Sequence, residues 1–534
     1  MNDEPLDADV VIIGAGPVGL AAGLLMSQYG IRATVLERRA ERNHHPKARG
    51  IRLRASELAR LWGLDDELRA IAMPAETHRF IYTETVAGGE IARTESMTSL
   101  DKSWSSVRPY RVSQDLLEQA LERHLVAAPL VRLEKGVTVE SIAQDDDGVE
   151  LAVRDAARGP ARIRAKYVIA ADGVGSSMRS ALGIAFGSDA PTPFWQSIYW
   201  HGDLRPYTAE RPAIMYYTRS GGSGGLVGVA PAGGEDRWVT IIQNAPTRER
   251  PPALSEEEAI AAVRRAVGVD ELKVDVLSSE TFRISADVAS SYRVGRVFLA
   301  GDAAHSLPPT GGFGINTGFA DVHNLAWKLA MVLTGSAPES LLASYETERR
   351  PVALSNAAWS VGNAQRFVKV KAALMADDRD ELRRLLDDQH RHVDPIEQDL
   401  GFSYAPGSEP SEIAVGTITF GARAPHAPVL VNGRTVSTLD VFDGRMTVLL
   451  GAADSVWLSA IPKGTTVRVL GEPGFEGADQ TLAERYSLGE QGAAIVRPDG
   501  HVGWLTHSVA GDLRQRFAAA WDATVNGGLA AEKA

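Results

Sequence analysis

The sequence predicts an α/β protein built from more than one domain, and three observations support that class. An apolar run at 9–13 is rich in β-branched residues and leads directly into a glycine-rich turn and a helical pattern. A second strand-like run, turn and helical pattern lies at 296–333. Short apolar runs separated by Gly and Pro, within 181–284 and again after about residue 400, predict sheets of short strands.

Composition restricts the class of protein further. The 534 residues are enough for two or three domains, and 44% hydrophobic and 23% charged residues are typical of a globular chain. The net charge is −12 without a block of Lys and Arg, which argues against nucleic acid and anionic membranes as partners. Because there is no cysteine, a redox role needs a bound cofactor. The acidic N-terminus and the lack of a membrane-length apolar run predict a soluble, cytoplasmic protein.

The first strand, turn and helix have the pattern of a dinucleotide-binding unit. The turn contains Gly14, Gly16 and Gly19, the helical pattern continues to Gly30, and a second apolar run ends at Glu37. Gly14 permits the tight turn, Gly16 lets the backbone approach a pyrophosphate, and Gly19 lets helix and strand pack closely. Glu37 can accept hydrogen bonds from ribose hydroxyls. The unit predicts an adenine dinucleotide site and leaves open whether FAD or a nicotinamide nucleotide occupies it.

The stretch 301–329 predicts which dinucleotide is bound. It follows a strand, turns at Asp302, passes through the loop PPTGGFG and enters a helix expected over 315–335, with Asn316 or Thr317 as its N-cap. Asp302 can accept hydrogen bonds from a polyol such as ribityl, and the loop can lie flat against a planar ring. The helix dipole favours the negative charge of a reduced flavin. We therefore expect FAD, bound non-covalently.

The sequence has no second glycine fingerprint that would hold another dinucleotide. The glycine cluster at 220–228 is not followed by a helical pattern, so it predicts a hairpin turn. A nicotinamide nucleotide is therefore expected to bind only transiently.

These motifs, together with YVIAADGVGSSMR at 167–179, resemble those of the single-component (class A), FAD-dependent aromatic hydroxylases of the p-hydroxybenzoate and phenol hydroxylase group. HPKARG, ASELARLWGL and the C-terminal GARAPH, STLDVF and IVRPDGHVGW are most similar to hydroxylases of aromatic polyketides. The resemblance covers nearly the whole chain. It implies an α/β fold with a Rossmann-type FAD-binding domain, an inserted antiparallel-sheet substrate domain and a thioredoxin-like C-terminal domain.

The resemblance also implies how the domains are interleaved. The implied ranges are 1–75, 100–180 and 285–370 for the FAD-binding domain, 76–100 and 181–284 for the substrate-binding domain, 371–400 for a helical connection, and 401–534 for the C-terminal domain. Without cysteines the last domain cannot exchange thiols, so an oligomer contact or a scaffold is the expected role.

Candidate site residues follow from the motifs and from the resemblance. The cofactor-binding candidates are Gly14, Gly16, Gly19, Glu37, Arg38, Lys47, Gln114, Asp172, Asp302, Gly311, Gly312, Gly314, Ile315 and Asn316. The resemblance implies that Asp172, with Arg179 nearby, belongs to a loop serving FAD and the incoming nucleotide. Lys47 stands where many relatives carry Arg, and Arg49 has no assigned role. No metal site is expected.

The substrate side is less specific in the sequence. Aromatic residues concentrate in the short strands, and an aromatic sheet beside a flavin suits a planar substrate. Trp195, Tyr216 and Tyr217 are the substrate candidates, and His201 and Pro308 the catalytic ones, with His201 as a possible base for a phenol.

The implied activity is that of a monooxygenase. FAD, reduced by NADPH or NADH, would activate O₂ as a C4a-hydroperoxyflavin and hydroxylate a phenolic, polycyclic aromatic substrate of the polyketide type. A small phenol as substrate, a reductase or dehydrogenase of the same fold, and a non-catalytic FAD-loaded binding protein are the alternatives. A monomer or homodimer is expected.

Overall fold

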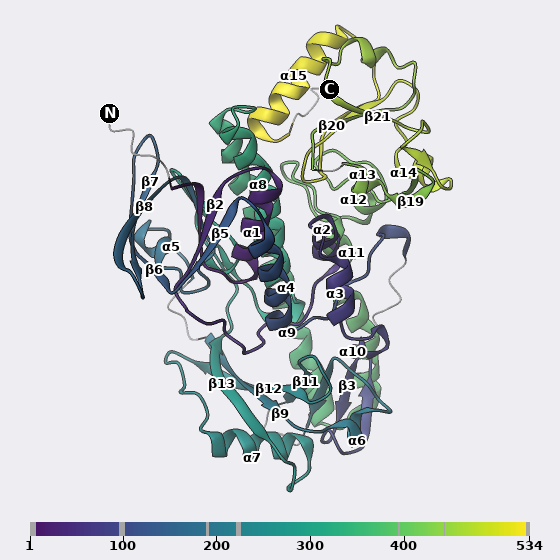
Figure 1. Cartoon of the computed structure of the whole chain (residues 1–534). Coiled ribbons are helices and arrows are strands. Elements are labelled where there is room, and N and C mark those ends of the chain that lie inside the picture. The colour runs from purple at the N-terminus through teal and green to yellow at the C-terminus, as the bar shows by residue number, and fades with distance from the viewer. Residues whose placement is uncertain are drawn as a thin grey trace.

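The structure is a computed structural model that describes residues 7–94, 102–187, 192–219, 226–393, 396–442 and 444–529. Figure 1 shows three bodies: one that begins at the N-terminus and contains α1, a sheet below it, and a C-terminal body at the upper right that ends in α15 (Leu513–Gly527). Among the described helices, none combines the length and the apolar character that a membrane span needs.

The first body is built on an eight-stranded sheet with the order β15-β16-β8-β1-β2-β5, to which β6 and β7 are joined. Its central pairs are parallel, as the apolar run at 9–13 predicts, because a strand covered on both faces is apolar along its whole length. The strands are β1 (Ala8–Ile13), β2 (Ala33–Glu37), β5 (Val131–Lys135), β6 (Val137–Gln144), β7 (Val149–Asp155), β8 (Gly159–Ala170), β15 (Arg293–Val294) and β16 (Val297–Leu299).

Helices pack on this sheet and on one another. α1 contacts both α4 and α8, and its buried apolar residues join the sheet in one core. The helices of this body are α1 (Pro17–Gln28), α2 (Leu53–Leu61), α3 (Asp65–Ile71), α4 (Gln114–Ala127), α5 (Ser177–Ala181) and α8 (Gly314–Leu333).

The start of α8 differs from the predicted one. The helix begins at Gly314 with Phe313 in the N-cap position, so Asn316 and Thr317 lie in its first turn and neither is the cap. The Asn316 side chain instead bonds other loops: its Oδ1 accepts the backbone N–H of Arg52 at 2.8 Å. This contact joins residues far apart in the sequence, so the local pattern that predicts a cap could not reveal it.

The second body is a seven-stranded sheet with the order β13-β9-β12-β11-β10-β3-β4. Its pairs are antiparallel except β10 with β3, which is parallel, so the sheet is mixed rather than purely antiparallel. β3 and β10 come from separate segments of the chain, and no hairpin fixes their relative direction. The strands are β3 (Phe80–Thr83), β4 (Glu90–Arg93), β9 (Thr192–His201), β10 (Met215–Thr218), β11 (Val227–Pro231), β12 (Arg237–Thr247) and β13 (Asp275–Arg283).

The glycine cluster at 220–228 joins β10 to β11. These two strands pair antiparallel, as the two arms of a hairpin do, while 220–225 lie outside the described residues. The short helix α6 (Arg205–Thr208) follows β9, and α7 (Glu256–Val267) packs its apolar side against one face of the sheet.

A long helix connects the first body to the second sheet. α9 (Ser344–Met375) packs on α8 with its N-terminal part, and its C-terminal part joins α10 (Arg379–Val393) and the sheet in a separate apolar cluster. One further pair of short strands lies beside it, β14 (Asp287–Val288) with β17 (His305–Ser306). The opposite face of the sheet from α7 therefore looks toward the first body (Figure 1).

The C-terminal body holds a four-stranded sheet in the order β21-β20-β23-β24, in which only β20 and β21 are parallel. Its strands and those of a small neighbouring sheet are β18 (Pro428–Val431), β19 (Arg434–Ser437), β20 (Thr447–Leu450), β21 (Thr466–Val469), β22 (Glu476–Gly477), β23 (Ala493–Val496) and β24 (Val502–Thr506). The helices before α15 are α11 (Ile396–Leu400), α12 (Glu412–Gly416), α13 (Thr438–Phe442) and α14 (Thr481–Arg485).

Candidate functional site

A cavity of 1240 Å³ lies between the first body and the second sheet. One end is lined by the β1–α1 turn, the end of β2 and the turn after β16, and the other end by the free face of the second sheet. A pocket for one small ligand is usually about 300–1,000 Å³. The cavity is therefore larger than one such ligand needs, and its two ends differ in chemistry.

The glycines at the first end are placed as the fingerprint predicts. Gly14 has a φ of 101°, and a Cβ on it would stand 2.4 Å from the Ala171 carbonyl oxygen. A Cβ on Gly19 would stand 1.9 Å from the Gly14 carbonyl oxygen, so this glycine keeps helix and turn in contact and does not line the cavity. Gly16 lines the cavity, and a Cβ there would meet no atom within 4 Å. The backbone at Gly16 is thus open to a ligand.

Glu37 is fixed beside this turn. Its Oε2 accepts the backbone N–H of Ala15 at 2.9 Å, and its Oε1 accepts that of Arg39 at 2.9 Å. Both carboxylate oxygens keep further lone pairs for hydroxyl donors. Arg38 also lines the cavity and is exposed.

The turn after β16 places Asp302 on the cavity wall and is held from behind by Asp321 of α8. Asp321 is fully buried; its Oδ2 accepts the Gly301 N–H at 3.2 Å and lies 2.7 Å from His305 Nε2. Its Oδ1 accepts Arg349 Nε of α9 at 3.0 Å. These charges hold the pKa of Asp321 below its usual range despite burial, whereas desolvation inside the cavity raises the pKa of Asp302, whose side chain is open to the cavity. The motif GDAAH does not predict Asp321, because the contacts of Asp321 with Gly301, His305 and Arg349 depend on how α8 and α9 pack.

The loop before α8 exposes backbone to the cavity. Gly311, Gly312, Gly314 and Ile315 line it, and a Cβ on Gly312 or Gly314 would meet no atom within 4 Å. The loop is anchored on the far side, where Arg52 Nη1 donates to the Gly311 carbonyl at 2.9 Å. Pro308 lines the cavity just before this loop.

Asn316, by contrast, does not line the cavity. Its Nδ2 donates to the carbonyls of Gly50 and Gly312, at 3.1 and 2.6 Å. The side chain therefore ties the loop before α8 to the loop before α2 and is occupied by protein partners.

Gln114 begins α4 and lines the cavity between these two loops. Its Oε1 accepts the Ala48 N–H at 3.0 Å, and its Nε2 donates to Glu118 Oε1 at 2.8 Å. Burial raises the pKa of Glu118 to about 7, although Gln114, Arg42 and Lys47 act in the opposite direction. Glu118 is not among the site residues expected from the sequence, although its position one helical turn after Gln114 is a signal for it.

Asp172 and Arg179 occupy the loop after β8 in different ways. Asp172 lines the cavity; its Oδ2 accepts the Met178 N–H at 3.3 Å, while its Oδ1 is buried without a protein partner among the described residues. Arg179 is buried and donates to the carbonyls of Ala303 and Val174, each at 2.8 Å. Arg179 therefore joins this loop to the Asp302 turn.

The second end of the cavity is an aromatic wall. Tyr217 of β10 stacks on Tyr82 of β3, with ring centroids 5.3 Å apart, and lies 4.9 Å from the ring of Phe367 on α9. Trp195 of β9 meets Phe282 of β13 edge to face at 6.2 Å. Apart from Tyr82 these residues all line the cavity.

Tyr216 and His201 are not brought to this wall. Tyr216 precedes Tyr217 on the strand, so it faces the other side, where it packs in the core under α7 and donates its hydroxyl to the Arg211 carbonyl at 2.7 Å. His201 lies six residues beyond Trp195 on β9, about 20 Å along the strand, with its Nδ1 3.3 Å from Asp236 Oδ2. Neither residue lines the cavity.

The loop before α2 is docked onto the second sheet by polar contacts that the sequence did not reveal. The buried His45 lies between two hydroxyls, with Nδ1 2.7 Å from Ser278 Oγ and Nε2 2.8 Å from Ser197 Oγ. Lys47 lines the cavity, and its Nζ lies 3.9 Å from Glu280 Oε2 of β13. The expected cofactor residue Lys47 thus already has a carboxylate neighbour.

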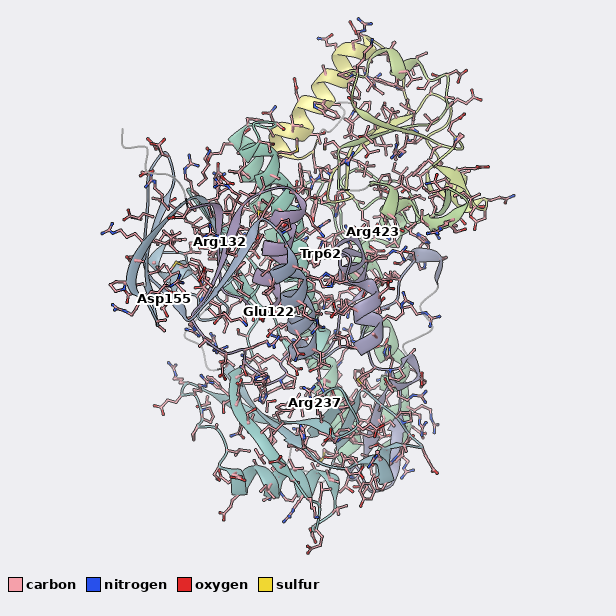
Figure 2. All side chains as sticks on the ribbon, in the orientation of Figure 1. Trp62, Glu122, Arg132, Asp155, Arg237 and Arg423 are labelled. Carbon is pink, nitrogen blue, oxygen red and sulfur yellow. The ribbon has the colours of Figure 1, made fainter. Side chains whose placement is uncertain are left out.

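A second bridge joins the two bodies away from this loop. Arg237, labelled in Figure 2 on the side of the sheet that faces the first body, donates its Nη2 to the buried Asp115 of α4 and its Nε to Tyr199 Oη at 2.7 Å. Glu122, also labelled, lies 3.7 Å from Arg42 and 2.5 Å from Lys135. The Arg237–Asp115 pair thus fixes the second sheet to the first body, whereas Glu122 ties the loop before α2 to α4 and β5 within the first body.

An FAD molecule fits the residues at the first end. Glycine backbone is open where a pyrophosphate and a planar ring would lie, and Asp172 Oδ1 and Arg42 Nε are buried on the cavity wall without a hydrogen-bond partner among the described residues. No group of three or more His, Asp or Glu side chains in the described part of the chain is arranged to hold a metal.

Two models of known protein families match this chain, one over its N-terminal two thirds and one over its C-terminal part. A model described as FAD binding domain matches residues 7–360, and one described as aromatic-ring hydroxylase, C-terminal, matches residues 417–524. The chain belongs to the FAD-dependent aromatic-ring hydroxylases. The structure of this hydroxylase and the resemblance of its sequence motifs thus lead to the same family.

Relatives of this hydroxylase cover almost its whole length. The 4-methyl-5-nitrocatechol 5-monooxygenase of a Burkholderia species is 32% identical, over 95% of each chain. The tetracenomycin A2 monooxygenase-dioxygenase of Streptomyces glaucescens is also 32% identical, over 95% of this chain and 96% of its own. Among solved structures, the flavin-dependent monooxygenase PieE in complex with FAD and substrate superposes with a TM-score of 0.88 at 28% identity, covering 97% of this chain and 99% of its own. Relatives at this level hydroxylate polyketides and small phenols.

Proposed function

We propose that this hydroxylase uses NADPH or NADH and O₂ to introduce one oxygen atom into a phenolic, polycyclic aromatic compound of the polyketide type. The observation that carries the proposal is that one cavity joins a dinucleotide-binding end to an aromatic sheet face. A cofactor and a planar substrate can therefore lie in contact inside the protein.

The residues that would hold FAD line the cavity. The open backbone at Gly16 and the N-terminus of α1 suit the pyrophosphate, and Glu37 suits the adenosine ribose. Asp302 and Gln114 line the cavity and would bind ribityl hydroxyls, and the backbone of 311–315 suits the ring. When bound, the flavin supplies the hydride acceptance and oxygen activation that no side chain of this chain supplies.

The chain's own contribution is positioning and exclusion of water. The aromatic wall of Tyr217, Trp195 and Phe367 can stack on a planar substrate, and the loop before α2, docked through His45, forms part of the cavity wall between the two bodies. With a single dinucleotide fingerprint, the nicotinamide nucleotide has no domain of its own and would bind transiently beside the flavin.

The lining of the second end of the cavity supports a polycyclic substrate. The 1240 Å³ of the whole cavity exceed what one ligand of ordinary size fills, as a site for both a cofactor and a substrate requires, and apolar side chains line the second end from several strands of the second sheet. The relative that acts on 4-methyl-5-nitrocatechol makes a small phenol the second candidate.

Isotope labelling tests the reaction class. The protein, loaded with FAD and supplied with NADPH or NADH, is incubated under labelled O₂ with a three-ring hydroxyanthraquinone or with 4-nitrocatechol. We expect the ring compound to gain one labelled oxygen atom and to accelerate NAD(P)H oxidation at least about tenfold, equivalent to about 1.4 kcal/mol in the barrier. Label arriving from water, or reduction of the substrate without O₂, would indicate the reductase alternative. Turnover of the catechol alone would indicate a small phenol.

A further inference from the structure

A second, small cavity of 60 Å³ lies where α2, α8 and α9 meet the C-terminal body. Arg52 lines both this cavity and the large one, and its Nη1 donates to the Gly311 carbonyl of the loop before α8. The volume is about that of two water molecules or one small ion, at about 30 Å³ for each water of the liquid. A ligand here would lie behind that loop, outside the site proposed for the cofactor and the substrate.

Four arginines line the small cavity, and two of them have a carboxylate of their own. Arg52 Nε lies 2.5 Å from Asp399 Oδ1. Arg349 Nε lies 3.0 Å from Asp321 Oδ1. In each of these two pairs one positive charge meets one negative charge.

The other two arginines, Arg54 of α2 and Arg423 of the C-terminal body, share a single carboxylate. Arg54 Nη1 donates to Glu57 Oε2 at 3.0 Å, while Arg423 donates its Nε and Nη2 to the two oxygens of Glu57, at 2.9 and 2.6 Å. Despite burial, Arg423 and Arg54 hold the pKa of Glu57 below its usual range, so it carries one negative charge. Two guanidinium charges thus share one carboxylate, and one positive charge is left over in the described part of the chain.

Asp499, which also lines the small cavity, does not supply the missing charge. It belongs to a second network, in which Asp499 and Glu348 are paired with Arg497 and Lys328. Burial lowers the pKa of Lys328 to about 8, which leaves it charged at pH 7. The second network therefore balances its own charges, and the excess around Glu57 remains.

One N–H group of Arg423 has no acceptor. Because Nε and Nη2 both bond Glu57, the planar guanidinium directs Nη1 away from that carboxylate. Nη1 is buried and has no hydrogen-bond partner among the described residues. Burying a charged donor without a partner is costly, so a ligand that accepts from it is favoured.

His323 of α8 offers a second donor. Its Nδ1 lies 3.4 Å from Nε1 of Trp62, an atom that can only donate, and burial lowers the pKa of His323 to about 3, so the neutral ring carries its proton on Nε2. Nε2 is buried without a partner, and the Asp499 carbonyl, which acts on this ring, already accepts Arg54 Nη2 at 2.9 Å. Among the described residues on this wall, no buried side-chain acceptor lacks a partner.

We propose that the small cavity binds one small monovalent anion of the class of chloride, held by Arg423 Nη1 with His323 Nε2 as the second donor. Such an ion balances the excess guanidinium charge and accepts from both N–H groups. Water would leave the charge uncompensated and would need acceptors for its own protons. The anion thus acts as a structural ligand that joins the C-terminal body to α2 and α8.

Thermal unfolding of the FAD-loaded full chain tests the proposal in solution. At pH 7 and constant ionic strength, sodium gluconate is replaced stepwise by sodium chloride or sodium bromide. A ligand that binds only the folded protein stabilises it, so we expect either halide to raise the unfolding temperature by at least about 2 °C over gluconate. Gluconate is too large for the cavity, and equal effects of all three salts would overturn the proposal.

Arg54→Gln removes the excess charge, because it leaves Glu57 paired with Arg423 alone. The glutamine amide can still donate to the Asp499 carbonyl. We expect the variant to lose the dependence on halide and, in gluconate, to unfold at or above the temperature of the wild type. If Arg54 served only in its ion pair, the variant would unfold at a lower temperature in every salt, which would contradict the proposal.

Arg60→Gln is the matched control on the same helix. Arg60 donates its Nε and Nη2 to Asp440 of α13, at 3.0 and 2.9 Å, so it too connects α2 with the C-terminal body. Its loss should lower the unfolding temperature equally in chloride and in gluconate and leave the halide dependence as in the wild type. Loss of that dependence in both variants would mean that it does not arise from the shared carboxylate, and would overturn the proposal.

Crystals grown in sodium bromide locate the ion directly. We expect an anomalous difference peak within hydrogen-bond distance of Arg423 Nη1 in the wild type and in Arg60→Gln, and none in Arg54→Gln. Density without anomalous signal at this place, which indicates water, or bromide in the large cavity alone would overturn the proposal. A bromide peak without any effect of halide on unfolding would show binding at crystal concentration only, and would also overturn it.

Discussion

Glu118 shows how a single buried side chain can make stability depend on pH. It lies on α4, in contact with Gln114 and near Arg42, Lys47 and Asp115, and burial raises its pKa from 4.5 to about 7. Between these two values the folded protein holds a proton that the unfolded chain has lost. Stability therefore falls as pH rises through this window.

Glu118→Gln should remove this part of the pH dependence. We expect the FAD-free variant to be more stable than the FAD-free wild type at pH 8 by up to about 3 kcal/mol, at about 1.4 kcal/mol per pKa unit, and the difference to vanish near pH 4.5. The variant keeps an acceptor for Gln114. Urea unfolding at both pH values measures the effect, and a constant difference between the two proteins would contradict it. Because Asp302 is present in both proteins, its own raised pKa cancels.

Asp302 carries the most direct prediction about the cofactor. Its carboxylate lines the cavity where ribityl hydroxyls are expected, and Asp302→Ala removes the acceptor without opening the core. We expect FAD affinity to fall by roughly 10- to 100-fold, the loss of one or two hydrogen bonds to a charged group. The unfolding temperature of the FAD-free protein should stay near that of wild type. Flavin absorbance after gel filtration measures the retained cofactor, and full occupancy would contradict the role.

At the scale of elements, packing of α8 and α9 holds the turn that carries Asp302. Asp321 on α8 accepts from Gly301, lies against His305 and pairs with Arg349 on α9. The turn thus depends on a side chain that itself never reaches the cavity. In β10, by contrast, the strand itself decides which side chain reaches the cavity. Side chains alternate between the two faces of a strand, so Tyr217 faces the cavity and Tyr216 the core.

Asp321→Asn should therefore affect both folding and cofactor binding. The amide can still accept from Gly301 but cannot neutralise Arg349, which is left as an uncompensated buried charge at a cost of about 3–5 kcal/mol. We expect a lower unfolding temperature together with loss of FAD, whereas Asp302→Ala loses FAD alone. An Asp321→Asn protein with wild-type stability would show that the buried triad does not hold the turn.

At the scale of the whole molecule, the C-terminal body is joined to the first body by buried charges. Arg423, labelled in Figure 2 where the two bodies meet, donates Nε and Nη2 to the two oxygens of Glu57 on α2, at 2.9 and 2.6 Å. Arg497 donates to both oxygens of Glu348 on α9, at 2.6 and 2.8 Å. Arg497 and Lys328 lower the pKa of Glu348 to about 2. Buried ion pairs thus connect the C-terminal body to α2 and α9 of the rest of the chain.

Arg497→Met tests whether these bodies unfold together. Among the described residues, the substitution leaves Glu348 with Lys328 as its cation and Asn324 as a neutral donor, and it leaves Asp499 without Arg497, so we expect a loss of about 3–5 kcal/mol. Calorimetry should change from one transition to two as the C-terminal body separates first. Arg32→Met is the matched control, because Arg32 pairs with Asp9 at the surface and should cost at most about 1 kcal/mol. Equal effects of both variants would contradict the coupling.

The sequence by itself determined the features that depend on local spacing. The glycine fingerprint, the apolar first strand, the turn at Asp302 and the helix after it are each encoded within a few tens of residues, and they were sufficient to predict the α/β class, the family and FAD. Gly14 and Gly19 are required by close backbone contacts that the motif itself describes.

Only the tertiary structure decided which side chains share a surface. The roles of Asp321, His45 and Glu118 depend on packing between elements distant in sequence. His201 shares a strand with Trp195 but lies at its other end. Burial and the pairing of charges are properties of the packed molecule, because they depend on distances in space, which local sequence patterns do not contain.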